Sequence, residues 1–365
     1  MYHNPVKIIK TKNWREECGK FQGKLGIHNP LIITSHGNLK RQKLSTEFNS
    51  NSILSNVKPH PTFESCQMAI NFSKLSEFDG VIAIGGGSVM DTAKVVMAYM
   101  GTGKSDIHQL LKVTTPCKVR VPSIFIPTTH GSGSEVTMWG TVWNMNEKKK
   151  YSISNPELYP DIAILDGSIT LSLPLDISLI TTLDSLCHSF EAIWNKNSNS
   201  TSTSYAIEAI CLILTHVEQL KESPHNIDLR NVLLEASNIS GLSFSNTKTA
   251  AAHSISYPLT INYGIPHGLA CYLPLLSLLL INRGSIENEL DLIKKNLEMK
   301  SFSELIDSIK RIPDGIFQTN LKSWGVARTD LDDLAGQSFT KDRMDNNIQF
   351  LSKSDIKIIL TKMYE

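Results

Sequence analysis

The sequence predicts an α/β domain followed by an all-helical domain, and two patterns along the chain indicate this order. In the first half, short apolar runs rich in β-branched residues alternate with longer amphipathic segments, as they do in βαβ units. After about residue 168 these runs disappear and apolar residues recur at three-and-four spacing, which is typical of helices. Gly167 and Pro174 interrupt both patterns. We therefore expect one domain over residues 1–167 and a second over 168–365.

Four apolar runs of the first domain are expected to be strands. They are "PLIITS" (30–35), "GVIAIGGG" (80–87), "VPSIFIPTT" (121–129) and "IAILD" (162–166). Each is nearly continuous in apolar residues, as parallel strands covered on both faces are. Helical patterns such as "SVMDTAKVVMAYM" lie between them. The second domain is expected to be built from segments such as "SYAIEAICLILTHVEQLKE", whose apolar residues form one helical stripe.

The composition argues against nucleic acid, a membrane and a disulfide framework. Lys plus Arg number 36 and Asp plus Glu 35, a net charge of +1, without the clustered positive charge that binds nucleic acid or anionic lipid. The opening "MYHNPVKIIKTKNW" lacks the apolar core of a signal peptide, and "LACYLPLLSLLLI" (269–281) is too short to span a membrane. We expect a cytoplasmic protein whose cysteines are reduced and buried, because they are widely spaced without a CxxC pair. They are Cys18, Cys66, Cys117, Cys187, Cys211 and Cys271.

The first glycine-rich segment follows the run at 80–87. Gly85, Gly86 and Gly87 end the expected strand, and a helix is expected from about Ser88. Glycines let the backbone approach a ligand closely, and the N–H groups of a first helical turn suit a phosphate. A tight turn without a ligand is the alternative, but three consecutive glycines exceed what a turn requires. The pattern differs from the GxGxxG fingerprint of dinucleotide-binding proteins.

A second loop of small residues, "IPTTHGSGSEVT" (126–137), also follows an expected strand. Thr128, Thr129 and Ser132 can donate hydrogen bonds to a phosphate or a ribose, and Ser134 with Glu135 is expected to cap a following helix. Alone, such a loop is more often only a loop. Two of them at the carboxyl ends of parallel strands indicate one ligand crevice.

The segment "LDSLCHSFEAIW" (183–194) carries an acid and an imidazole in an apolar run. On a helix, Asp184 and His188 lie one turn apart on one face, where they can chelate one ion. A solvated contact between the two side chains is the alternative. Further along, "AAHSISYPLTINYGIPHGLA" supplies His253 on a helical pattern and His267 after a break.

One carboxylate and three imidazoles make a ligand set for a divalent ion. The set suits Fe(II), Zn(II), Mn(II) or Co(II). Each histidine taken alone also fits a core histidine with satisfied hydrogen bonds. Because all four residues lie in apolar helical surroundings of one domain, leaving them unpaired would be costly. Together they favour a metal site.

Four of these motifs resemble the iron-containing (group III) alcohol dehydrogenases in order and spacing. They are "GGGSVMDTAK", "PTTHGSGSEVT", "LDSLCHSFEA" and "HSISYPLTINYGIPHG". The resemblance covers nearly the whole chain. It implies the fold shared by dehydroquinate synthase and these dehydrogenases: a dinucleotide-binding α/β domain, a helical domain, and a metal in the cleft between them. A homodimer is usual in the family.

The resemblance also implies roles for individual residues. The metal, Fe(II) or Zn(II), would be held by Asp184, His188, His253 and His267. The cofactor would be bound by Gly86, Gly87, Ser88 and Asp91, by Thr128, Thr129 and Ser132, and by Lys150. The ion would act as a Lewis acid on the substrate oxygen while hydride moves to or from the nicotinamide.

Two departures from the family pattern bear on the chemistry. Many members end an early strand with an acid that binds the adenosine ribose, whereas this chain has Ser35 there with Lys40 and Arg41 nearby. Without a carboxylate, a 2′-phosphate is not repelled, so we expect NADPH to be preferred and NADH to remain usable. Many members also carry a histidine four residues after the third ligand as a proton relay. Here that place holds Tyr257, whose hydroxyl, or a water, would donate instead.

The run "KTAAAHSISYPLTINYGIPHG" resembles the branch that reduces phosphonoacetaldehyde to 2-hydroxyethylphosphonate in phosphonate biosynthesis. Such a substrate needs a cation near the metal. Lys248, five residues before His253, would provide one unless it lies on a solvated helix face.

Three alternatives to this activity stay open. One is reduction of another small aldehyde, such as lactaldehyde or butyraldehyde. Another is a cyclase like dehydroquinate synthase, which normally holds its metal through a glutamate and two histidines. The last is a metal-binding protein without turnover, which would not need two glycine-rich loops.

Overall fold

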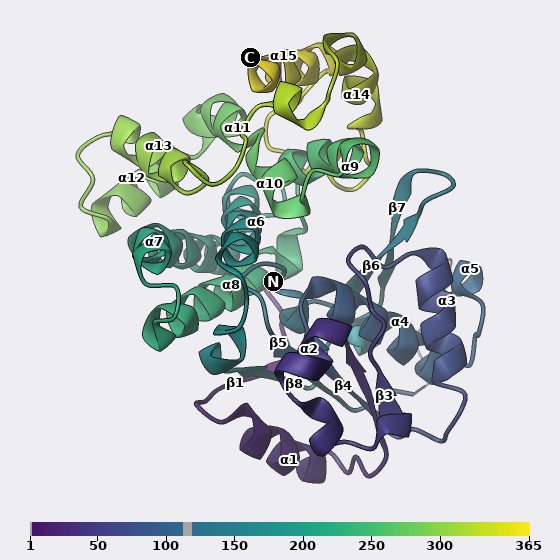
Figure 1. The fold of residues 1–365 in the computed structure, drawn as a ribbon. Coiled ribbons are helices and arrows are strands. Elements are labelled where there is room, and N and C mark those ends of the chain that lie inside the picture. Colours follow the sequence, from purple (N-terminus) through teal and green to yellow (C-terminus); the bar gives the residue numbers. More distant parts are fainter. Residues whose placement is uncertain (1, 112–118) are drawn as a thin grey trace. The chain divides into compact units, whose positions relative to one another are not determined.

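The computed structural model describes residues 2–111 and 119–365, which form two compact units (Figure 1). The α/β unit comprises Asn4–Thr129 and Gly133–Leu173. The helical unit comprises Pro174–Glu365 with His130–Ser132 and the first residues up to His3. The last passage of the chain from one unit to the other follows Leu173, close to the domain boundary that we expected after residue 167. The short insertion of His130–Ser132 into the helical unit was not expected.

The α/β unit is built on a six-stranded parallel sheet with the order β1-β8-β5-β4-β2-β3. The strands are β1 (Lys7–Lys10), β2 (Pro30–Thr34), β3 (Ile53–Leu54), β4 (Gly80–Gly85), β5 (Ser123–Pro127) and β8 (Ile162–Leu165). The four predicted strands are confirmed, since they correspond to β2, β4, β5 and β8. The two others, β1 and β3, lie at the sheet edges. Lys7 and Lys10 of β1 are exposed, and β3 is buried but only two residues long, so neither has the continuous apolar run of a central strand.

Both faces of this sheet are covered by helices. The helices are α1 (Trp14–Lys24), α2 (His36–Arg41), α3 (Phe63–Phe72), α4 (Gly87–Thr102) and α5 (Ile107–Leu111). Successive residues of β2 point to opposite faces: Leu31 and Ile33 pack in a core with α3 and α4, whereas Ile32 packs in a second core with α1. Figure 1 shows α1 on one side of the sheet and α3 and α4 on the other. This two-sided burial explains why the central strands are apolar throughout.

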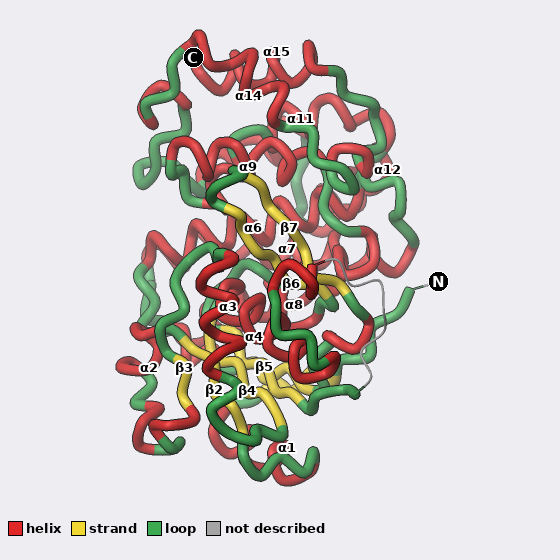
Figure 2. The backbone as a smooth tube through the Cα atoms, turned by 90° about the vertical axis from the view of Figure 1, so that its right-hand side faces the viewer, coloured by secondary structure: helices red, strands yellow, loops and turns green. Residues whose placement is uncertain are grey.

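A separate antiparallel hairpin, β6 (Trp139–Asn144) with β7 (Lys149–Ser154), also belongs to the α/β unit. It appears in Figure 2 as a yellow pair apart from the main sheet. The prediction that Ser134 and Glu135 cap a helix is wrong, because only a 3₁₀ turn (Ser134–Val136) follows and then β6. The β-branched and aromatic residues of β6 favour a strand over a helix, and the hairpin supplies the partner that such a strand needs.

The remaining unit is helical: within Pro174–Glu365 the structure has no β-strand. Its helices are α6 (Leu175–Ile193), α7 (Ser200–Glu222), α8 (Ile227–Thr247), α9 (Ala251–Tyr263), α10 (His267–Tyr272), α11 (Leu275–Asn282), α12 (Glu287–Asn296), α13 (Phe302–Arg311), α14 (Leu331–Gln337) and α15 (Lys353–Tyr364). The central helix is α6, which packs against α7, α8 and α10. The predicted all-helical character of this region is confirmed.

One stretch, His267–Ser285, is long and apolar enough by composition to meet the criteria for a membrane-spanning helix. Of its most apolar window, 61% is buried inside the helical unit, and Pro274 separates it into α10 and α11. Its apolar side chains therefore serve as core residues of this unit.

The cysteines of the described residues are all free. Four of them are buried, but Cys211 is only half-buried, so the expectation that every cysteine is buried is wrong there. Cys117 lies outside the described residues.

Candidate metal and cofactor sites

Three helices of the helical unit carry the predicted metal ligands. Asp184 and His188 lie one turn apart on α6, and His253 lies in the first turn of α9. After α9 the chain turns at Gly264, whose φ of 69° is the left-handed conformation that favours glycine. His267 is then the first residue of α10. The predicted helical positions, with the break before His267, are confirmed.

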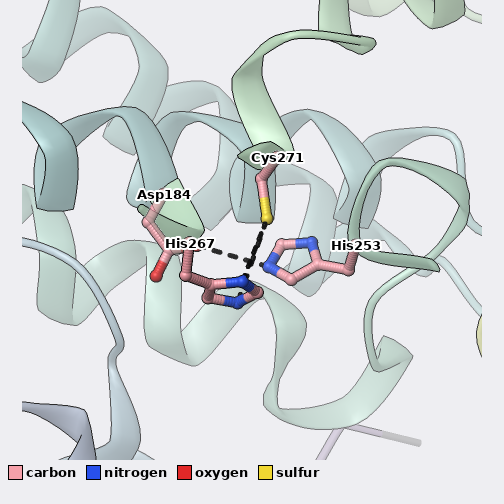
Figure 3. Close-up of side chains that lie close together, drawn as sticks. All are labelled: Asp184, His253, His267 and Cys271. Atoms are coloured by element: carbon pink, nitrogen blue, oxygen red, sulfur yellow. Dashed lines mark hydrogen bonds and ion pairs between the residues drawn. The ribbon is translucent and has the colours of Figure 1, made fainter. Parts of the chain in front are cut away.

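A group of four potential ligands converges between these helices. One ligand atom from each of Asp184, His253, His267 and Cys271 lies within 4.8 Å of the other three (Figure 3). The close approach of α10 to α6 depends on Gly268, since a Cβ there would lie 2.0 Å from the carbonyl oxygen of Ile180. Cys271 enters the group because it follows His267 by one helical turn.

His188 is placed differently from the other predicted ligands. Its ring stacks on the ring of His253, with centroids 4.3 Å apart, and on that of Phe244 at 4.1 Å. It is not among the four residues whose ligand atoms lie mutually within 4.8 Å. The structure thus brings three of the four predicted ligands together and adds a thiol that sequence reasoning had left among the core cysteines.

Glu191, also on α6, orients His253. Its Oε2 lies 2.5 Å from Nδ1 of His253, and its Oε1 accepts a hydrogen bond of 3.1 Å from the His253 backbone N–H. Both side chains are buried. This contact leaves Nε2 of His253 facing Asp184, with Oδ1 at 3.4 Å. Sequence reasoning missed Glu191, although it follows Asp184 by seven residues and so shares its helix face.

The electrostatics of the group suit a cation. Burial opposes ionisation of Asp184, but the imidazoles of His188, His253 and His267 outweigh it and hold the pKa of this carboxyl below its usual value. Burial likewise opposes a charge on His253, yet Cys271, Glu191 and Asp184 raise its pKa. Asp184 Oδ1 and His253 Nε2 are buried and face each other at 3.4 Å, within ion-pair range but without a hydrogen bond. Buried polar atoms without hydrogen bonds are costly, and a divalent ion would satisfy both, so these residues fit a metal.

Two further predicted site residues, Tyr257 and Lys248, lie close to His253 in the sequence. The ring of Tyr257 is nearly parallel to that of His267, with centroids 6.1 Å apart and an interplanar angle of 19°. Lys248 is the residue that ends α8, with φ of 65°, so it is not part of a helix face. Its side chain is half-buried, and its carbonyl oxygen accepts a hydrogen bond from Asn195.

The glycine-rich loop joins β4 to α4, as predicted. Gly86 precedes the helix in an extended conformation, and no side chain caps the first turn of α4, so its N–H groups are available to an anion. Packing also requires glycine here, because a Cβ at Gly85 would lie 2.4 Å from Val89 and one at Gly86 3.0 Å from Thr129. These glycines can therefore both form a tight turn and bind a phosphate.

The sheet reverses its winding direction beside this loop. From β2 the chain adds β3 on one side, then crosses over to add β4 and β5 on the other. In open α/β sheets, ligands bind outside the carboxyl ends of the strands at such a switch point. Here the carboxyl ends of β2 and β4 lie side by side, since Thr34 pairs with Ile84. Ser35 and Gly86 therefore follow neighbouring strand ends of the α/β unit.

Ser35 and Thr128 are linked through Asn38 at this edge. The hydroxyl of Ser35 accepts a hydrogen bond from the Asn38 backbone N–H at 3.3 Å, and Asn38 Nδ2 donates to Thr128 Oγ1 at 3.2 Å. The guanidinium of Arg41 donates to Asn38 Oδ1 at 2.9 Å and lies 2.7 Å from where a Cβ of Gly37 would be. A positive charge is thus held at the end of β2, where no carboxylate stands.

A buried lysine braces the second predicted loop. Lys94 has no exposed surface. Its Nζ, which carries three N–H donors, lies 2.7 to 2.9 Å from four acceptors: the backbone oxygens of Ser134 and Trp139 and the hydroxyls of Ser134 and Thr137. Burial lowers the pKa of Lys94 to about 7, against the opposing charge of Asp91. The Ser134 hydroxyl in turn donates to Asp91 Oδ1 at 3.0 Å. Sequence reasoning assigned no role to Lys94.

The other predicted cofactor residues divide between the two units. Ser88 accepts a hydrogen bond from the His60 backbone N–H at 3.2 Å. The ammonium of Lys150, on β7, lies 5.5 Å from the Trp143 ring centroid, and its charge favours the ionised form of Asp91, whose pKa burial raises. Ser132 belongs to the segment His130–Ser132, which the helical unit holds.

Comparison with known proteins identifies the class to which this fold and these sites belong. Residues 5–167 match the family profile described as iron-containing alcohol dehydrogenase. Residues 178–364 match the profile of the C-terminal region of the Fe-containing alcohol dehydrogenase family. The chain therefore belongs to the iron-containing alcohol dehydrogenase family.

Individual relatives place the chain within that family. It is 32% identical over 254 residues to long-chain-alcohol dehydrogenase 1 of Geobacillus thermodenitrificans, a match that covers 67% of this chain and 64% of that protein. It is also 32% identical over 212 residues to the phosphonoacetaldehyde reductase of Streptomyces viridochromogenes, covering 56% and 53%. These matches span somewhat less than two thirds of the relatives' lengths.

A solved structure matches over the whole chain. The NAD+ complex of sulfoacetaldehyde reductase from Bifidobacterium kashiwanohense superposes with a TM-score of 0.89 at 26% identity and covers 100% of this chain and 98% of that one. The predicted fold class is confirmed. Since both profiles are those of alcohol dehydrogenases, a cyclase of the dehydroquinate synthase type is not favoured.

Proposed function

We propose that this protein is a metal-dependent, NAD(P)H-dependent alcohol dehydrogenase that works as a reductase of a small aldehyde. The observation that carries the proposal is the convergence of buried Asp184 and His253 with half-buried His267 in the iron-containing alcohol dehydrogenase family. These three residues would hold Fe(II) or Zn(II). His188, the fourth ligand by family resemblance, stacks on one of them.

The metal and the side chains around it are proposed to have separate roles in the reaction. When bound, the ion supplies Lewis-acid stabilisation of the charge that develops on the substrate oxygen. Glu191 keeps His253 oriented through its Nδ1, as an outer carboxylate does for a metal-binding histidine. Tyr257, beside the His267 ring, is the proposed source of the proton that converts the alkoxide into the alcohol, directly or through a water.

The α/β unit would hold the dinucleotide. Backbone N–H groups at Gly86, Gly87 and Ser88 are proposed to bind the pyrophosphate, because the first turn of α4 has no side-chain cap. Asp91 and Lys150 are proposed to bind the nicotinamide ribose, and Thr128, Thr129 and Ser132 the remaining cofactor groups. The hydride transfer itself is cofactor chemistry.

NADPH is the proposed preferred cofactor, with NADH also accepted. Ser35 ends β2 without a carboxylate, and Arg41 is held nearby by Asn38, so a 2′-phosphate would meet a cation rather than an anion. A relative of known structure was solved with NAD+, which supports the acceptance of NADH. A kcat/KM at least about tenfold higher with NADH than with NADPH, a difference of about 1.4 kcal/mol, would contradict this preference.

The proposed substrate is a short aldehyde with an anionic tetrahedral group, with phosphonoacetaldehyde as the first candidate. Two relatives carry the names phosphonoacetaldehyde reductase and sulfoacetaldehyde reductase, and both substrates are acetaldehydes that bear an anion. Lys248 is the cation proposed to bind this group. Lactaldehyde and butyraldehyde are the uncharged alternatives. The product of the first candidate would be 2-hydroxyethylphosphonate, a compound of phosphonate biosynthesis.

The test is a panel of aldehydes with the purified protein. NADPH oxidation is followed at 340 nm with Fe(II) or Zn(II) present, and kcat/KM is compared for phosphonoacetaldehyde, sulfoacetaldehyde, lactaldehyde and butyraldehyde. The proposal requires steady turnover that a chelator abolishes, with the charged aldehydes preferred. Turnover that persists after the metal is removed, or none with any aldehyde, would refute it.

A lysine variant and two measurements complete the test. In Lys248→Ala, KM should rise for phosphonoacetaldehyde and stay unchanged for butyraldehyde, whereas equal changes would remove Lys248 from the site. Light scattering would test the homodimer that we propose from the family resemblance. Fractionation of the source cells would test the proposed cytoplasmic location.

A further inference from the structure

A cavity of about 620 Å³ opens on the helical unit, and no residue of the proposed metal group lines it. Its walls come from the end of α10, from α11, from α13 with the loop that follows it, and from α15, all labelled in Figure 1. These segments belong to one compact unit. The volume falls within the range of about 300–1,000 Å³ that is usual for small-molecule sites.

The cavity contains a tyrosine hydroxyl without a protein partner. Tyr272, the last residue of α10, is only 5% exposed and lines the cavity. Its hydroxyl makes no hydrogen bond with any described residue, and its oxygen is not enclosed by protein. A buried tyrosine usually has a hydrogen-bond partner for its hydroxyl. The partner of Tyr272 therefore has to be a molecule that occupies the cavity.

Three cations lie around the cavity. Lys310 and Arg311 are neighbours at the end of α13, and Lys362 lies on α15, so two walls carry positive charge. All three residues are exposed, and none of their side chains forms an ion pair with a described residue. Lysine and arginine side chains without protein partners are able to bind a phosphate.

Two carboxylates and an aromatic ring also line the cavity. Asp307 and Asp314 lie on the same stretch of chain as Lys310 and Arg311, and they too form no ion pair with described residues. A bare phosphate would be repelled by them, whereas the hydroxyls of a ribose donate hydrogen bonds to a carboxylate. Half-buried Phe317 offers a flat apolar face, on which a nucleobase can stack.

We infer that this cavity is a second nucleotide site, which binds a nucleoside monophosphate such as AMP. The cations bind the phosphate, the carboxylates bind the ribose hydroxyls, the base stacks on Phe317, and Tyr272 donates a further hydrogen bond. An amino acid would also use charges of both signs, but it would leave much of the cavity empty. The inference goes beyond the proposed function, because neither the dinucleotide site of the α/β unit nor the metal group takes part.

Isothermal titration calorimetry of the full chain with AMP tests the inference. NADPH is kept at saturation, so that AMP does not enter the dinucleotide site. One equivalent of AMP should bind at least about tenfold more tightly than adenosine or inorganic phosphate, because each of these lacks contacts that the other makes. No binding of AMP in the presence of NADPH, or equally tight binding of inorganic phosphate, would overturn the inference.

Variants of the lining residues locate the bound AMP. Lys310→Gln should weaken binding about tenfold and Tyr272→Phe about threefold, as expected for the loss of a charged and of a neutral hydrogen bond. The control is Lys295→Gln, which changes an exposed lysine of α12 outside the cavity and should bind AMP like the wild type. Circular dichroism checks the fold. Affinities that stay unchanged in both Lys310→Gln and Tyr272→Phe would also overturn the inference.

Photolabelling of the wild-type protein does not depend on a variant that folds. A photoreactive azido derivative of AMP should attach to residues 307–319, and excess AMP should prevent this. Attachment only to the glycine-rich loop after β4 would assign AMP to the dinucleotide site and overturn the inference. Since none of these measurements uses aldehyde turnover, a failure of the proposed function and a failure of this inference are distinguishable.

Discussion

Oε2 of Glu191 lies 2.5 Å from Nδ1 of His253, and this contact determines which nitrogen of that imidazole faces Asp184. The two residues are 62 positions apart in the chain, on α6 and α9. The carboxylate is ionised: burial raises its pKa, but the charge and hydrogen bonds of His253 and its backbone outweigh this and lower it. A buried carboxylate behind a metal-binding histidine fixes the ring and strengthens it as a donor.

Glu191→Gln should weaken metal binding about 10-fold to 100-fold, the range typical of outer partners of metal ligands. The amide preserves the shape but not the charge that supports His253. Metal affinity is measured by competition with a chromogenic chelator, and circular dichroism checks the fold. Glu208→Gln, on the exposed face of α7, is the control. Equal affinities for the two variants would show that Glu191 does not support the site.

Gly268→Ala should destabilise the protein by about 1–3 kcal/mol or more, because overpacking forces the backbone to move. The added Cβ would lie 2.0 Å from the Ile180 carbonyl oxygen and 3.1 Å from the Asp184 Cβ, so metal affinity should fall as well. Urea unfolding measures the first effect. Gly284→Ala adds the same atom with nothing within 4 Å and should be nearly neutral. A Gly268→Ala protein as stable as this control would contradict the close packing of α10 on α6.

Ser35→Asp should reverse the proposed cofactor preference. A carboxylate at the end of β2 would repel the 2′-phosphate of NADPH, an effect of about 1 kcal/mol or more at close range, while it could bind the ribose hydroxyls of NADH. The ratio of kcat/KM values for the two cofactors reports the change. Ser35→Asn is a matched variant, because Asn also caps helices well but adds no charge. If both variants shift the ratio equally, charge at this position does not select the cofactor.

Lys94 should make a contribution to stability that increases with pH. The pKa of an unfolded lysine is about 10.4, whereas burial lowers that of Lys94 to about 7. Between these values the unfolded chain binds a proton that the folded protein does not, so stability rises with pH from about 7 to about 10. Lys94→Met removes this dependence.

The test compares urea midpoints of wild type and Lys94→Met below and above neutral pH. Lys94→Met should be less stable than the wild type at both pH values, since the oxygens around Nζ lose their donor. The difference in stability between the two proteins should be larger at high pH. Lys58→Met, an exposed site, should show no such trend. A deficit that shrinks as pH rises would contradict the lowered pKa.

Most of the α/β unit could be predicted because its central strands are buried on both faces. Ile32 and Ile33 point to opposite cores, so the strand had to be apolar at every position. The edge strand Lys7–Lys10 could not be recognised, since its two lysines are exposed. The hairpin after Val136 was not predicted, because Ser134 and Glu135 form a local pattern that favours the start of a helix. The later strand β7 pairs with β6 and overrides this local preference.

The sequence by itself determined the layered architecture and the family, because periodicity, buried runs and motif spacing are local properties of the chain. Only the tertiary structure decided which side chains share one site. Cys271 joins Asp184, His253 and His267 because Gly268 lets α10 pack on α6, and Glu191 supports His253 from behind. Such convergence depends on distances between helices that no local pattern encodes.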